Sequence, residues 1–163
     1  LDNRMILTKH GFTGIIIKWR RKMRTYDDWL IGLKERLSDP KYARTFFDAV
    51  VSDFIETRFF PAFLESTDLL IKAQKNVDVE LVREVYLVLG TIYFYLKDYD
   101  KARQNFNSAT ECDPKDKEAK LMADLTLLYE NKAENENGVL TDYIGLSSAI
   151  GGIINKPYEE LRV

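Results

Sequence analysis

From Tyr26 onward, apolar residues recur at the spacing that places them on one face of an α-helix. The first such series consists of Trp29, Leu30, Leu33 and Leu37. It ends at Ser38-Asp39-Pro40, where an acidic cap followed by Pro also favours the start of a second helix. Two aromatic-rich segments, Tyr42 to Phe60 and Phe63 to Gln74, continue the pattern with a break at Pro61. The pattern therefore predicts a helical hairpin after the first helix.

The stretch from Arg83 to Asp116 carries the most specific pattern in the chain. Gly90 and Ala109 are small where the two helices of a hairpin would approach closely, and Asp98-Tyr99-Asp100 forms a short turn with a capping Asp. The residues with matching spacing are Tyr86, Leu89, Gly90, Tyr93, Ala102, Phe106, Ala109 and Pro114. This spacing resembles the helix-turn-helix unit of about 34 residues found in the tetratricopeptide repeat family.

The resemblance implies an all-α fold of antiparallel helical hairpins that stack as an array, because one such unit cannot bury its apolar face alone. Tyr86 stands where the family usually has Trp, and Lys97 stands where it usually has Gly before the turn. We therefore expect a strained turn at Lys97. The flanking segments match only weakly: residues 116–132 look like a capping helix, and residues 42–74 look like a degenerate repeat.

The resemblance also implies a concave groove that binds another polypeptide. The predicted groove residues lie on the first helix of the repeat and on the helix after it: Glu84, Leu87, Val88, Thr91, Phe94, Tyr95, Leu121, Met122, Leu125 and Tyr129. Because this surface is mainly apolar, the expected partner is an amphipathic helix or peptide of another protein. Family members that clamp a chaperone's C-terminal carboxylates have Lys and Asn where this chain has Leu87 and Thr91, so we do not expect that ligand. The alternative is that these residues bury against the N-terminal helices or the C-terminal segment.

The last part of the chain, residues 134–163, begins as a polar linker and continues as an apolar stretch from Val139 to Ile154. This stretch is too short to span a bilayer. One interpretation is a final helix that caps the helical stack. The other is a segment that fills the groove as an internal ligand, or that pairs with a second copy in a homo-oligomer.

Charge separates the first residues from the rest. Residues 1–25 are strongly basic, whereas the whole chain of 163 residues has a formal net charge of −2. We therefore treat residues 1–25 as a basic arm, which could form a short β-hairpin, remain extended or begin a helix, and residues 26–133 as the helical domain. The residues expected to contact an anionic surface are Lys18, Arg20, Arg21, Lys22 and Arg24. Lipid head groups and nucleic-acid phosphates both suit this charge, and the acidic remainder of the chain argues against nucleic acid.

Residues that could carry catalysis are sparse. His10 and Cys112 are the only residues of their kinds, and no nucleophile with a base, metal-ligand spacing or phosphate loop is recognisable. With 45% hydrophobic and 31% charged residues, the composition suits a globular domain with a core. The sequence therefore predicts a non-catalytic scaffold or adaptor without a cofactor. The chain begins with Leu1, so we expect that a tethering segment could precede it; a cytoplasmic or a cell-envelope location fits.

Overall fold

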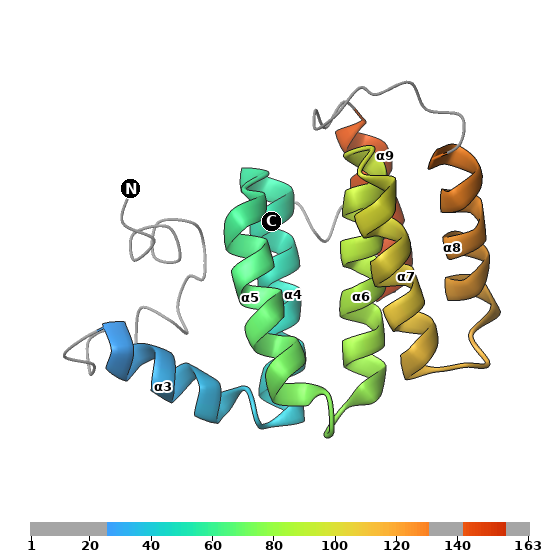
Figure 1. The fold of residues 1–163 in the computed structure, drawn as a ribbon. Coiled ribbons are helices and arrows are strands. Elements are labelled where there is room, and N and C mark those ends of the chain that lie inside the picture. Colours follow the sequence, from blue (N-terminus) through green and yellow to red (C-terminus); the bar gives the residue numbers. More distant parts are fainter. Residues whose placement is uncertain (1–25, 131–141, 156–163) are drawn as a thin grey trace. The chain divides into compact units, whose positions relative to one another are not determined.

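The computed structural model describes residues 26–130 and 142–155, and Figure 1 shows them as helices. Within these ranges there are seven helices and no strand, which confirms the predicted all-α class. The helices form two compact units that divide between Asp78 and Val79. This division falls inside the range 26–133 that the sequence suggests is one domain. The predicted alternatives for the arm at residues 1–25 lie outside the described residues.

Unit 1 contains α3 (Tyr26–Arg36), α4 (Pro40–Thr57) and α5 (Phe60–Gln74). The junction between α3 and α4 follows the prediction, because Asp39 is the N-cap of α4. Its carboxylate accepts a hydrogen bond from the backbone N–H of Lys41 at 2.9 Å. Leu33 and Leu37 are both buried, as expected for the apolar face of the first helix.

The helices α4 and α5 pack against each other as the predicted hairpin. Their contact is built on aromatic rings, and the ring centroids of Phe54 and Phe63 lie 5.0 Å apart. The break occurs earlier than predicted, at Arg58, which adopts a left-handed conformation with φ of 58° and ends α4. Pro61 instead lies in the first turn of α5. The backbone N–H groups of a first turn have no partner within the helix, so the N–H that Pro lacks costs no hydrogen bond there.

A buried polar side chain connects two helix ends within unit 1. Gln74, in the last turn of α5, is fully buried, and its Nε2 donates a hydrogen bond to the backbone oxygen of Leu37. The carbonyl of Leu37 follows the end of α3, where the last helical carbonyls have no partner within the helix. This bond therefore connects the C-terminal ends of α3 and α5.

Unit 2 contains α6 (Val79–Tyr95), α7 (Tyr99–Cys112), α8 (Lys117–Glu130) and α9 (Tyr143–Ile154). The helices α6 and α7 form an antiparallel hairpin, and α8 packs against α7 on its other side (Figure 1). The residues that carry the family resemblance meet in this hairpin: Ala102, Phe106 and Ala109 are fully buried in one cluster, with Tyr86 and Tyr93 packed against it.

The turn between α6 and α7 has the geometry that the sequence predicts. Lys97 is left-handed with φ of 60°, a conformation that Gly adopts without strain and Lys does not. The next residue, Asp98, is the N-cap of α7, and its side chain accepts a hydrogen bond from the backbone N–H of Lys101 at 3.3 Å. The strain at Lys97 is therefore followed directly by a stabilising cap.

Candidate binding surface

The position of α8 in unit 2 depends on a partly buried ion pair. Asp116 caps α8 by accepting hydrogen bonds from the backbone N–H groups of Glu118 at 2.9 Å and Ala119 at 3.1 Å. Its second carboxylate oxygen pairs with the guanidinium of Arg83 on α6. Arg83 is held in turn by Glu80, one turn earlier on α6. This network fixes the start of α8 relative to α6.

The electrostatics at Asp116 follow from these contacts. Burial acts to raise the pKa of the Asp116 carboxyl, but the bonds from the backbone N–H of Ala119 and from Arg83 favour the charged form. The result is a pKa below the ordinary Asp value. The pKa of Arg83 is raised, chiefly by its hydrogen bond to Glu80. Both side chains therefore stay charged at neutral pH.

The inner face of α8 consists of small residues. Ala119, Ala123 and Thr126 follow one another at helical spacing and are buried, and the Thr126 hydroxyl donates to the backbone oxygen of Met122 at 2.6 Å. The two alanines belong to the same cluster as Ala102 and Phe106. Small side chains on this face let α8 pack closely against α7.

The outer face of α8 is apolar and exposed. Leu121, Leu125 and Leu128 lie at helical spacing on the side of the helix opposite the alanines, and they are 56%, 37% and 57% exposed. Tyr129, at the edge of this row, is exposed as well. We call Leu121, Leu125, Leu128 and Tyr129 the α8 stripe. Three of its residues were predicted groove residues; Leu128 was missed, although it follows Leu121 at helical spacing.

Aromatic rings support one end of the α8 stripe. The ring centroid of Tyr129 lies 5.0 Å from that of Phe94 on α6, with the rings edge to face. Tyr99, at the start of α7, completes the group, with centroids 5.4 Å from Phe94 and 6.2 Å from Tyr129. Edge-to-face pairs of this kind add stability beyond buried area. The exposed Tyr129 is therefore held in place by two rings from the α6–α7 hairpin.

The structure separates the predicted groove residues into two groups. On α6, Leu87, Val88 and Thr91 are buried, and the Thr91 hydroxyl donates to the backbone oxygen of Leu87 at 2.8 Å. The partly buried members of the predicted set are Glu84, Phe94, Tyr95 and Met122. Only Leu121, Leu125 and Tyr129 present exposed apolar surface. The α6 half of the predicted groove is thus much less accessible than the α8 half.

The C-terminal helix α9 packs on α6, and Figure 1 shows it running alongside that helix. Burial, and secondarily the negative charge of Asp142 just before α9, raises the pKa of Tyr95 near the end of α6. At the other end of α9, Ile153 packs against the cluster that contains Leu87. The start of α9 therefore lies near Tyr95, the last of the predicted groove residues on α6, so the two helices run antiparallel.

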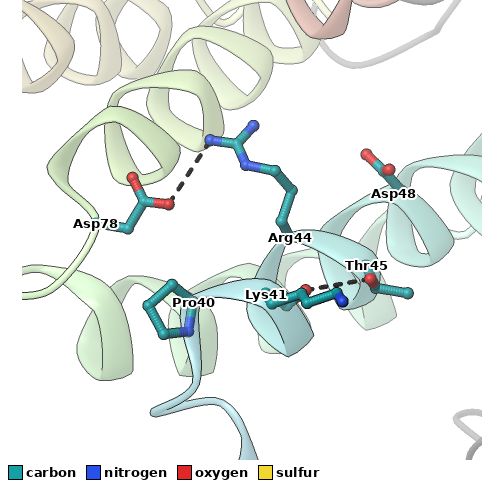
Figure 2. A pocket seen from close by; sticks show the side chains of 6 residues that line it. All are labelled: Pro40, Lys41, Arg44, Thr45, Asp48 and Asp78. Atoms are coloured by element: carbon teal, nitrogen blue, oxygen red, sulfur yellow. Dashed lines mark hydrogen bonds and ion pairs between the residues drawn. The ribbon is translucent and has the colours of Figure 1, made fainter.

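Unit 1 carries a shallow polar hollow at the start of α4, with a volume of about 420 Å³. Figure 2 shows its six lining residues: Pro40, Lys41, Arg44, Thr45, Asp48 and Asp78. Two cationic and two anionic side chains balance each other, and Arg44 pairs with Asp78 at 3.8 Å. The hollow therefore has no net charge that would favour an anion or a cation, and the sequence contains no signal for it.

The other residues that the sequence analysis singled out, the basic residues of the arm, His10 and Cys112, do not contribute to the α8 stripe in the described part of the chain. Lys18, Arg20, Arg21, Lys22 and Arg24 lie outside the described residues, as does His10. Burial raises the pKa of the half-buried Cys112 thiol, which favours its neutral form. In residues 26–130 and 142–155, no group of three His, Cys, Asp or Glu side chains is arranged for a metal ion. No helix of this described part is long and apolar enough to cross a membrane.

Comparison with known proteins identified no relative. No family model matches the chain, and neither a curated protein nor a solved structure is significantly similar to it.

Proposed function

We propose that this protein is a non-catalytic interaction module, similar to a tetratricopeptide-repeat scaffold or adaptor, whose unit 2 binds an apolar helical segment of a partner polypeptide on the α8 stripe. The observation that carries the proposal is the exposure of Leu121, Leu125 and Leu128 on one face of a helix whose opposite face is packed. A contiguous exposed apolar face on a soluble domain is typical of a protein-interaction site.

The chemistry of the stripe favours a helix as its ligand. Apolar anchors at helical spacing suit an amphipathic helix laid alongside, since its own apolar side chains then meet them along the same direction. Within unit 2, α6 already packs against a short apolar helix, α9. The exposed ring of Tyr129, supported by Phe94, supplies an aromatic anchor of the kind that often contributes most to binding.

The test uses two Leu-to-Glu substitutions on the same helix. Leu125 belongs to the stripe, whereas Leu127 is 43% exposed and points to another side of α8. Leu125→Glu places a charge in the proposed interface and should abolish binding of a partner that the wild-type chain retains. Leu127→Glu introduces the same charge outside it and should leave that binding unchanged.

Site-specific crosslinking locates the contact directly. A photoreactive amino acid at position 125 should form a covalent adduct with the partner polypeptide, and the same amino acid at position 127 should not. Equal loss of binding in both Glu variants, or adducts at both positions, would show that the partner does not bind along the stripe. Binding that survives Leu125→Glu in a folded chain would exclude the proposal.

A further inference from the structure

The helix α9 has a sequence that forms a helix only weakly by itself. Its 12 residues include Gly145, Gly151 and Gly152, and each Gly destabilises a helix by about 1 kcal/mol relative to Ala. An isolated helix of this length is marginal in water even with a favourable sequence. The helical state of α9 therefore depends on its contact with α6.

The contact itself combines apolar burial with an unfavourable polar group. Leu146 and Ile150, one turn apart, are fully buried, and they form the apolar face of α9. Ser147, beside them, is also fully buried, and its hydroxyl has no hydrogen-bond partner. An unpaired buried hydroxyl opposes docking, because its bonds to water are lost without replacement. The docked state is thus a balance of opposing contributions.

The outward side of α9 is different in character. Ile144 is 70% exposed, and the Cβ that a side chain at Gly152 would add meets no atom within 4 Å. Both ends are defined by caps: Asp142 accepts a hydrogen bond from the backbone N–H of Gly145 at 2.8 Å, and Asn155 ends the helix in a left-handed conformation. The segment is consequently a complete short helix whose most extensive contact in the described part of the chain is with α6.

We propose that α9 is an internal ligand of unit 2, which occupies a helix-binding face on α6 and is displaced by a partner helix of the same kind. The expected partner segment is apolar, carries small residues at helical spacing and lies antiparallel to α6, because α9 has this composition and its start lies near Tyr95 at the end of α6. The inference rests on the proposed function, since the displacing helix belongs to the polypeptide that also contacts the α8 stripe.

The test uses a fluorescent synthetic peptide of residues 142–155 as the probe, with binding to the full-length chain measured by anisotropy. In the wild-type chain the attached α9 competes with the peptide, so the apparent association constant is the intrinsic one multiplied by the fraction of chains in which the face is free. Two variants at the exposed Gly152 change this competition without altering α6. Gly152→Ala strengthens the attached helix, and Gly152→Pro breaks it.

Gly152→Ala should weaken binding of the peptide by about fivefold, in proportion to the gain in helix stability. Gly152→Pro should strengthen it by at least about tenfold, because Pro inside a helix removes a backbone bond and clashes with the preceding turn. In wild-type chain, hydrogen exchange should be faster at the amides of α9 than at those of α6 and α7, since local opening of α9 does not require their unfolding.

Four results would overturn the proposal. One is equal peptide binding by all three chains, and another is no binding by a Gly152→Pro chain that keeps the circular dichroism of its other helices. Loss of the whole fold in Gly152→Pro, or exchange of α9 at the same rate as α6, would show that α9 is a permanent part of the core. Because the peptide probes α6 and needs no partner, this failure is distinguishable from loss of partner binding in Leu125→Glu.

Discussion

Gly90 on α6 faces the ring of Phe106 on α7 so closely that a Cβ built at Gly90 would lie 2.7 Å from two of the ring carbons. Phe106 is fully buried and belongs to the cluster that joins α6, α7 and α8, so the ring has little room to move. The packing of α6 against α7 therefore requires Gly at position 90. The steric cost of a Cβ there is larger than the gain in helix propensity that Ala would bring.

We expect Gly90→Ala to destabilise the protein by about 1–3 kcal/mol through overpacking, even though Ala is the better helix former. The measurement is chemical denaturation followed by circular dichroism. Phe106→Leu should relieve the clash, so the double variant should be more stable than the sum of the two single changes predicts. Strict additivity would contradict a direct contact between the two positions.

The carboxylate of Asp116 is expected to matter more than other capping carboxylates, because it both caps α8 and pairs with Arg83. Asp116→Ala should lower the free energy of unfolding by about 2–4 kcal/mol. Asp113→Ala is the matched control: the Asp113 side chain accepts only an exposed hydrogen bond from the backbone N–H of Lys115, and its loss should have a clearly smaller effect. Equal effects would show that the pair with Arg83 adds nothing.

Acid should weaken the stabilisation that Asp116 provides through its cap on α8 and its pair with Arg83. The pKa of Asp116 is lower in the folded protein than its ordinary value, so the unfolded chain takes up the proton first as the pH falls. The stabilisation by Asp116 is therefore complete above the ordinary Asp pKa of about 4 and is lost as the pH falls through the lower folded pKa. Unfolding free energies measured between pH 6 and pH 2 should fall less steeply for Asp116→Asn than for the wild type.

Lys97 offers a substitution that should stabilise the protein. Its left-handed conformation is unfavourable for any residue with a Cβ, so Lys97→Gly should raise the free energy of unfolding by up to about 1 kcal/mol after the entropy lost by Gly is subtracted. Lys97→Ala removes the same long side chain but keeps the strain, and it should give no such gain. A rise in thermal midpoint for Gly alone is the expected outcome.

The two halves of the predicted groove should respond differently to charge. Leu87 is buried in the cluster that joins α6, α7 and α8, so Leu87→Glu should destabilise the fold by more than about 3 kcal/mol. Leu125 is exposed, so Leu125→Glu should change stability by less than about 0.5 kcal/mol. Thermal denaturation of both variants tests this contrast. A stable Leu87→Glu chain would mean that the α6 face is more open than the structure shows.

Local chemistry made much of the fold predictable. The caps at Asp39 and Asp98 and the strained turn at Lys97 involve residues a few positions apart, so their geometry follows from nearby sequence. The close approach of two helices at Gly90 was predicted from the spacing of the hairpin residues, and the structure shows that the ring of Phe106 occupies that contact. Pro61 was misplaced because Pro is compatible with both a break and a first helical turn.

The amino-acid pattern by itself determined that the described chain is helical, where most of its helices begin and end, and which residues of the α6–α7 hairpin meet. Only the tertiary structure decided that the helices divide at Asp78, that α9 lies on α6, and that the α8 stripe stays exposed. Helical periodicity shows which face of each helix is apolar. It does not show which of these faces pack against each other, because any two apolar faces could do so. Which of them pair depends on shape and on contacts between distant segments, such as Arg83 with Asp116, and these exist only once the chain has folded.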